Sequence, residues 1–248
     1  MRKIGTGVVA LVVALGLGVV SAHGATLWYN GDLDDVSALA NEIDPIDFGA
    51  SGSPLTYDDF VVPVGGWVVT NVWSNNTLNF VPPDATQAYW EIRSGVSAGD
   101  GGTLVAGGTS AASQTATGRL FWGTETEYRV EVSGLNIALS PGRYWLAVAP
   151  VDPDTSGGGS SDQAYVTTTS GVNALGTPAG DNGNAFFDSA FFGYDFASTQ
   201  TVTGEDYDFS MGVGGRANAP GVIPEPATLA LLGLGAVGLV LRRRRRAA

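Results

Sequence analysis

The segment TETEYRVEV, residues 124–132, alternates between apolar and charged side chains over most of its length. Tyr128, Val130 and Val132 occupy every second position, and charged residues lie between them. Successive side chains of a β-strand point to opposite faces, so the pattern predicts a strand with one face toward a core and the other toward water. The segment AYWEIR, residues 88–93, shows the same alternation.

The rest of the central chain consists of similar short segments separated by turns. GWVVTNVW (66–73) and RYWLAVAP (143–150) carry large or β-branched residues on both faces, as expected for central strands of a sandwich. Turn residues punctuate the chain, as in PVGG (63–66) and SPG (140–142). About nine or ten strands at this spacing predict an all-β fold, an antiparallel, jelly-roll-like β-sandwich. The further strands are predicted at 26–29, 56–62, 119–122, 163–168, 191–196 and 207–214.

Domain boundaries follow from changes in composition. We expect a signal peptide at 1–25, a β-sandwich domain at 26–216, and a linker with a sorting segment at 217–248. A break near Pro150 into two small sandwiches is the alternative. Within the body, only residues 33–42 show any helical pattern, over a short length.

The N-terminal segment has the three parts of a secretory signal. Arg2 and Lys3 precede an apolar stretch from about Val8 to Val20, and small residues follow. Ala22 is the expected cleavage position, with Gly24 and Ala25 as alternatives. The apolar stretch is short for a membrane span, so we predict a cleaved signal peptide rather than an N-terminal anchor.

The C-terminal segment VIPEPATLALLGLGAVGLVLRRRRRAA, residues 222–248, concentrates positive charge beside an apolar run. As a helix, the 15 residues Ala227–Leu241 would span about 22 Å, less than the roughly 30 Å of a bilayer core. Snorkelling by Arg242 makes a marginal transmembrane helix feasible. Arg242, Arg243, Arg244, Arg245 and Arg246 would then remain cytoplasmic as a stop-transfer signal, because positive charges favour that side.

This C-terminal segment resembles the PEP-CTERM sorting signal. The resemblance rests on Pro224, Glu225 and Pro226, followed by an apolar segment and a terminal arginine cluster. It implies recognition by an exosortase, which cleaves near the Pro-Glu-Pro motif after a transient stay in the inner membrane. It also implies a Gram-negative-type envelope and an association with exopolysaccharide or biofilm matrix. The segments YDDFVVP (57–63) and SPGRYWL (140–146) are similar to secreted bacterial β-sandwich modules, which supports the fold alone.

Charge and residue usage exclude several functions. Between Thr26 and Gly221 the chain holds 23 Asp and Glu against five Arg, a formal charge of −18 that disfavours nucleic acid as a partner. Cysteine is absent and the single histidine, His23, lies in the signal segment. A processed chain would therefore lack a Ser-His-Asp triad, a Cys-His dyad, disulfides and ordinary zinc or copper sites. We predict no enzyme activity and no catalytic residues.

One acidic loop has the spacing of a calcium loop at its start. Asp152 and Asp154 are two residues apart, and Asp162 lies near the end of the loop. Position twelve, however, is Gln163 instead of a bidentate acid, so a solvated turn is the favoured interpretation. We therefore predict no cofactor, with a structural Ca²⁺ on these acids as the alternative. The acidic clusters at 32–35 and 206–208 are interpreted as solvated loops or strand exteriors.

Aromatic residues offer a second hypothesis, a carbohydrate-binding platform on one face of the sandwich. The favoured interpretation is that these aromatics fill the core. A secreted glycosidase or lyase using paired carboxylates is the third hypothesis. The aromatic candidates are Trp67, Trp73, Trp122, Phe186, Phe187, Phe191, Phe192 and Tyr194.

The first hypothesis is thus an exported, non-enzymatic cell-surface or extracellular-matrix protein. Its expected partners are an exosortase-type processing enzyme and exopolysaccharide. We expect it to stay anchored by the C-terminal helix until processing, and then to remain at the cell surface or outside the cell.

Overall fold

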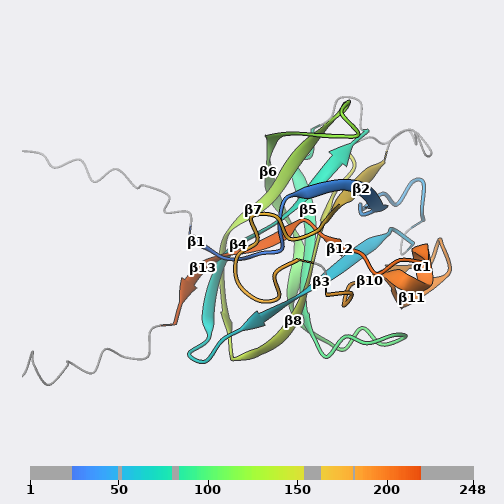
Figure 1. Ribbon diagram of the computed structural model, residues 1–248. Coiled ribbons are helices and arrows are strands. Elements are labelled where there is room, and N and C mark those ends of the chain that lie inside the picture. The colour runs from blue at the N-terminus through green and yellow to red at the C-terminus, as the bar shows by residue number, and fades with distance from the viewer. Residues whose placement is uncertain (1–23, 50–51, 80–83, 154–162, 181, 219–248) are drawn as a thin grey trace, which may run out of the picture.

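The computed structural model describes residues 24–49, 52–79, 84–153, 163–180 and 182–218 (Figure 1). The predicted signal peptide up to residue 23 lies outside the described residues. The same holds for the sorting motif, the transmembrane helix at 227–241 and the arginine cluster.

The described chain is almost entirely β-structure, which confirms the predicted all-β class. Every pair of strands is antiparallel. A short helix, α1 (Thr199–Thr203), follows the eleventh strand. The strands are β1 (Ala25–Tyr29), β2 (Leu33–Ala40), β3 (Leu55–Val62), β4 (Trp67–Leu78), β5 (Gln87–Ser94), β6 (Thr103–Phe121), β7 (Glu125–Leu139), β8 (Gly142–Pro150), β9 (Ala164–Thr169), β10 (Phe186–Ser189), β11 (Tyr194–Ser198), β12 (Asp208–Phe209) and β13 (Met211–Ala217).

These strands belong to one curled sheet. Its main path runs β1-β13-β4-β7-β6-β5-β8-β3-β10-β11, and β9 joins β2 and β12 to the sheet beside β4. The long strand β6 makes the curl continuous. Its residues 103–111 pair with β5, and its residues 112–121 pair with β7. The two halves of the sheet therefore face each other across a shared interior (Figure 1).

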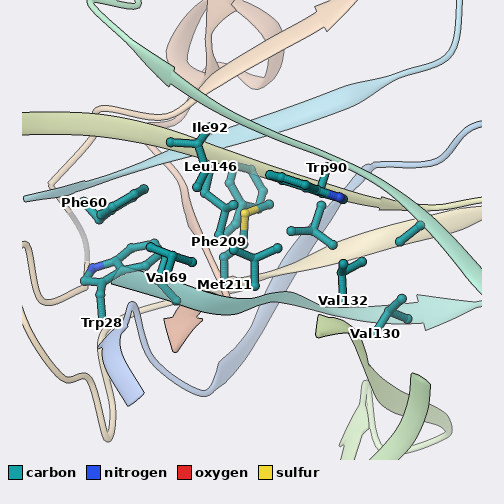
Figure 2. Packing of buried hydrophobic residues seen from close by; sticks show 14 of the residues in the cluster. Trp28, Phe60, Val69, Trp90, Ile92, Val130, Val132, Leu146, Phe209 and Met211 are labelled. Atoms are coloured by element: carbon teal, nitrogen blue, oxygen red, sulfur yellow. The ribbon is translucent and has the colours of Figure 1, made fainter. Parts of the chain in front are cut away.

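The hydrophobic core fills the space between these halves. Figure 2 shows Phe60, Ile92 and Leu146, from β3, β5 and β8, opposite Val69 and Val132, from β4 and β7. All five side chains are buried. The alternation predicted for residues 124–132 places its valines in the core, as expected. The other face is not open to water as predicted, because Glu127 and Glu131 on it are buried.

The helical pattern at residues 33–42 was misleading, because this segment forms β2. Leu39 pairs with Val166 of β9, so the open edge of β9 supplies the backbone partners. The Asp34 carboxylate accepts a hydrogen bond from the Val36 backbone N–H at 3.0 Å. Such local side-chain bonds compete with helical ones and favour turns and extended structure.

Three other boundaries differ from prediction. The strand expected at 119–122 is only the end of β6, which begins at Thr103. The segment expected at 191–196 becomes strand only from Tyr194, and β10 was not predicted. The predicted strand at 207–214 is divided into β12 and β13.

Candidate functional site on the polar face of the sheet

The side of β4, β6 and β7 that points away from the core carries polar and aromatic groups. Asn75 of β4 pairs with Arg129 of β7, and Arg129 pairs with Thr115 of β6. Paired residues of an antiparallel sheet share a face, so these side chains lie together. We call this side the polar face. Two hollows, each of about 280 Å³, lie on it.

A buried carboxylate occupies the middle of the polar face. Glu127 is 0% exposed and accepts hydrogen bonds from the hydroxyls of Thr117 at 2.6 Å and Thr167 at 2.8 Å. Its counter-charge is Arg119, whose Nε donates to Glu127 at 2.7 Å and whose Nη1 donates to Asp32 at 2.9 Å. Arg119 lies in β6, where the pairing with β7 shifts register between Ala116 and Leu120. It thus connects β6 to the segment between β1 and β2.

The first hollow is lined by groups that already bond to one another. The Tyr29 hydroxyl donates to Asp32 at 2.7 Å, and burial raises the pKa of Tyr29. The Arg129 guanidinium lies 3.7 Å from the centre of the Trp73 ring and so covers its face. The lining residues are Thr26, Tyr29, Asp32, Trp73, Asn75, Thr115, Ala116, Thr117, Arg119 and Arg129.

Trp73 reaches this position because β13 carries a glycine beneath it. A Cβ atom at Gly212 would lie 2.1 Å from an atom of the Trp73 ring, so only glycine allows the ring to cross this strand. Trp73 is 1% exposed and is not available as a sugar platform.

The second hollow lies at the β6–β7 hairpin and contains an exposed tryptophan. Trp122 is 63% exposed, and its ring stacks on Phe121 with centroids 4.5 Å apart. Its backbone has φ 49°, and its N–H donates to the Asp35 carboxylate. The lining residues are Ser37, Ala38, Thr77, Asn79, Phe121, Trp122, Glu125 and Tyr165.

The remaining aromatic candidates divide into buried and exposed groups. Trp67, Phe186 and Phe187 are buried, as the core interpretation predicts. Phe191 and Phe192 are exposed and lie next to the buried Phe48, away from the polar face. Tyr194 is partly buried in β11, where its ring contacts Phe187. Of these eight aromatics, the structure places only Trp73 and Trp122 beside a hollow on the polar face.

The acidic candidates come together only in part. Asp152 is buried, while Asp154 and Asp162 lie outside the described residues. Within the part of the chain that the structure describes, no group of three or more His, Cys, Asp or Glu side chains is arranged to hold a metal ion. The exterior interpretation was wrong for Asp208, which is 1% exposed. Asp208 is buried because β12 pairs with β9.

Asp208 lies near another buried carboxylate, Asp58 of β3, which is 0% exposed. Asp58 accepts hydrogen bonds from the backbone N–H groups of Phe209 at 2.6 Å and Asp59 at 2.7 Å, and from the Asn30 amide at 2.8 Å. Burial, reinforced by the charge of Asp208, raises the pKa of Asp58 well above its usual range. The sequence pattern did not indicate this pair, because both residues lie in predicted strands and the pattern does not show which strands come together.

Three buried or half-buried carboxyls predict a pH dependence of stability. The pKa values of Asp58, Asp59 and Asp188 are all raised, in each case mainly by burial. A raised folded-state pKa means that the folded chain holds the proton more tightly than the unfolded chain. This stabilisation is full below about pH 4, the unfolded aspartate value, and is lost as the pH rises through the raised values. We expect the Tm to fall from about pH 4.5 to pH 8 in calorimetry.

The variant Asp208→Asn is the matched test, because it removes the charge that raises the pKa of Asp58. Its Tm should change less over the same pH range than that of the unmodified protein. A Tm that rises with pH in the unmodified protein would contradict the assignment of these protons.

Comparison with known proteins identifies the C-terminal segment. Residues 222–246 match the PEP-CTERM protein-sorting motif, which confirms the resemblance noted in the sequence. This match defines the class: a β-rich protein that an exosortase sorts to the cell surface. No curated protein matches the chain in sequence. Among the described residues, no helix has the length and apolar character needed to cross a membrane.

Proposed function

We propose that this chain is a non-enzymatic surface or matrix protein whose acidic β domain contacts extracellular polysaccharide. The observation that carries the proposal is the PEP-CTERM match at residues 222–246, since it directs the chain to the cell surface. In this proposal, residues 1–25 form the export signal and the curled sheet is a jelly-roll-like β-sandwich. The domain acts after release from its anchor.

The tail delivers the domain by a temporary attachment. Residues 227–241 would hold the chain in the inner membrane, and Arg242–Arg246 would prevent further export because the positive-inside rule keeps them cytoplasmic. Cleavage near Pro224–Pro226 then releases the folded part, much as the GPI signal is removed during anchoring.

The two carboxylates that pair with Arg119 on the polar face support a non-enzymatic role. Asp32 and Glu127 both accept hydrogen bonds from Arg119, and Glu127 also accepts two from hydroxyls. General acid catalysis by a carboxyl needs a proton on an acid that can reach the substrate. An acid held in an ion pair below the surface, as Glu127 is, serves the fold instead.

The test is the sorting of the full chain in cells that contain an exosortase. Replacing Arg242–Arg246 by five glutamines should lower the processed, surface-associated fraction several-fold, since the stop-transfer charge is lost. Immunoblotting of inner-membrane, surface and matrix fractions measures this. The unmodified chain should appear in shortened form with the extracellular polymer.

Arg216→Gln provides the control, because Arg216 is an exposed arginine of the folded domain. Its processing should be normal. Normal maturation of the five-glutamine variant would refute the delivery step. Recovery of the mature chain in the medium, free of polymer, would refute the polysaccharide contact and leave the sorting intact.

A further inference from the structure

We infer that the second hollow binds one pyranose ring of a neutral polysaccharide, with Trp122 as the stacking platform. This inference rests on the proposed polysaccharide contact and assigns it to one place in the molecule. Nothing in the sorting motif requires such a site, because that motif lies in residues 222–246.

The Trp122 ring is supported by protein on one face and can contact a ligand with the other. Phe121, itself 4% exposed, supports one face of the indole, and 63% of Trp122 remains exposed. Stacking of this indole against the C–H face of a sugar would bury part of its water-exposed area. The side chain would not first have to leave a packed position. Burial of such aromatic surface is a main source of binding energy at protein interfaces.

The backbone keeps Trp122 in a conformation that tryptophan rarely adopts. Trp122 has φ 49° and Asp35 has φ 62°, and the two residues are joined by the hydrogen bond from the Trp122 N–H to the Asp35 carboxylate. Left-handed backbone at a bulky residue is costly and tends to cluster at ligand-binding positions. Here the strain directs a large aromatic side chain toward solvent at the edge of a hollow.

Three of the polar side chains that line the second hollow can bind a ligand. The side chains of Ser37, Asn79 and Glu125 make no hydrogen bond to other described residues. Together they offer a hydroxyl, an amide and a carboxylate, which can donate to and accept from sugar hydroxyls. The first hollow differs, since Asp32 and Arg119 there are already bonded to each other.

The charge around the hollow selects the class of sugar. Glu125 lines it, and Asp35 bonds to the backbone of the platform residue. The body of the chain carries a formal charge of −18, so a polymer of uronic acids or sugar phosphates would be repelled. A volume of about 280 Å³ lies just below the range of about 300–1,000 Å³ typical of drug-sized ligands, so it suits a single ring of a longer chain. A neutral, β-linked polymer with flat C–H faces fits these features.

The experiment measures binding of the full chain, in mild detergent, to soluble mixed-linkage β-glucan and to alginate by affinity electrophoresis. The β-glucan should retard the protein and the anionic alginate should not. Trp122→Asn should weaken β-glucan binding at least about tenfold, because a central aromatic anchor is lost. Asparagine tolerates the left-handed backbone, so this variant should keep its fold.

Two further variants make the result decisive. Asn79→Ala removes a hydrogen-bonding group from the same hollow without changing the hairpin, and should weaken binding several-fold. Phe191→Asn removes an exposed aromatic that does not line the hollow and should bind like the unmodified protein. Circular dichroism confirms that each variant is folded.

The outcomes separate the two levels of the proposal. Undiminished β-glucan binding by folded Trp122→Asn and Asn79→Ala would overturn the site while leaving a polysaccharide contact elsewhere. Preference for alginate would overturn the neutral-sugar assignment. Binding to neither polymer would overturn both the site and the polysaccharide contact, but not the sorting, which the fractionation experiment measures separately.

Discussion

Replacing Arg119 with methionine is expected to lower the free energy of unfolding by about 3 kcal/mol, because Glu127 would remain buried without its counter-charge. Breaking a buried ion pair on one side typically costs about 3–5 kcal/mol. We expect the lower end, since Glu127 keeps its hydrogen bonds from Thr117 and Thr167. The side chain of Arg119 is also 30% exposed, so water screens part of the interaction.

The double variant Arg119→Met/Glu127→Gln separates the cost of leaving the Glu127 charge unpaired from the cost of losing the arginine itself. With both charges removed, the loss should be clearly smaller than in Arg119→Met alone, and denaturant unfolding of both variants measures the difference. A single variant that loses less than about 1 kcal/mol would place the pair among ordinary surface salt bridges. Arg216→Gln, at an exposed position, should change the stability by no more than about 0.5 kcal/mol.

The second large effect is expected at Phe60. This side chain is 0% exposed and its ring stacks against three others, with centroid distances of 5.5 Å to Trp28, 6.0 Å to Trp67 and 5.7 Å to Tyr144. Figure 2 shows Phe60 beside Trp28 at one end of the core. Phe60→Ala should cost about 3–5 kcal/mol, because it removes buried apolar surface and leaves a cavity among rigid rings.

Phe60→Leu is the matched variant, since it keeps most of the volume and should cost about 1–1.5 kcal/mol. Phe191→Asn serves as the exposed control, because Phe191 is 57% exposed. Thermal or denaturant unfolding measures all three. Similar stability for Phe60→Ala and Phe60→Leu would show that the surrounding rings collapse into the space, contrary to a rigidly packed aromatic cluster.

Strong alternation made part of the fold predictable. Residues 124–132 and 88–93 each form a strand, because apolar side chains at every second position can be buried only by extended backbone. Most of β6 was missed for the opposite reason. Its sequence, TLVAGGTSAASQTATGRLF, consists mainly of small residues with little periodicity, and its strand structure comes from pairing with β5 on one half and β7 on the other.

The candidate site was predictable only in its residue types. Tryptophan on a sheet face was a reasonable sugar-binding candidate, but the alternation of apolar and polar residues does not separate Trp73 from Trp122. Trp73 is covered because Gly212 lets it lie across β13 and Arg129 stacks on it. Trp122 is exposed because the hairpin turn and Asp35 hold its backbone in a left-handed conformation. The glycine after Trp122 was the one local signal for this turn.

The sequence alone determined the all-β class and the sorting segment at 222–246, since both depend on local features: the period of side chains along a strand, and a linear motif with adjacent charge. The tertiary structure decided which charges are buried and which aromatic faces water. Glu127 is paired with Arg119 because the pairing of β6 with β7 brings the two residues together. Asp58 lies near Asp208 because folding buries β12. Burial is a property of neighbours brought together by folding, so the order of residues along the chain does not reveal it.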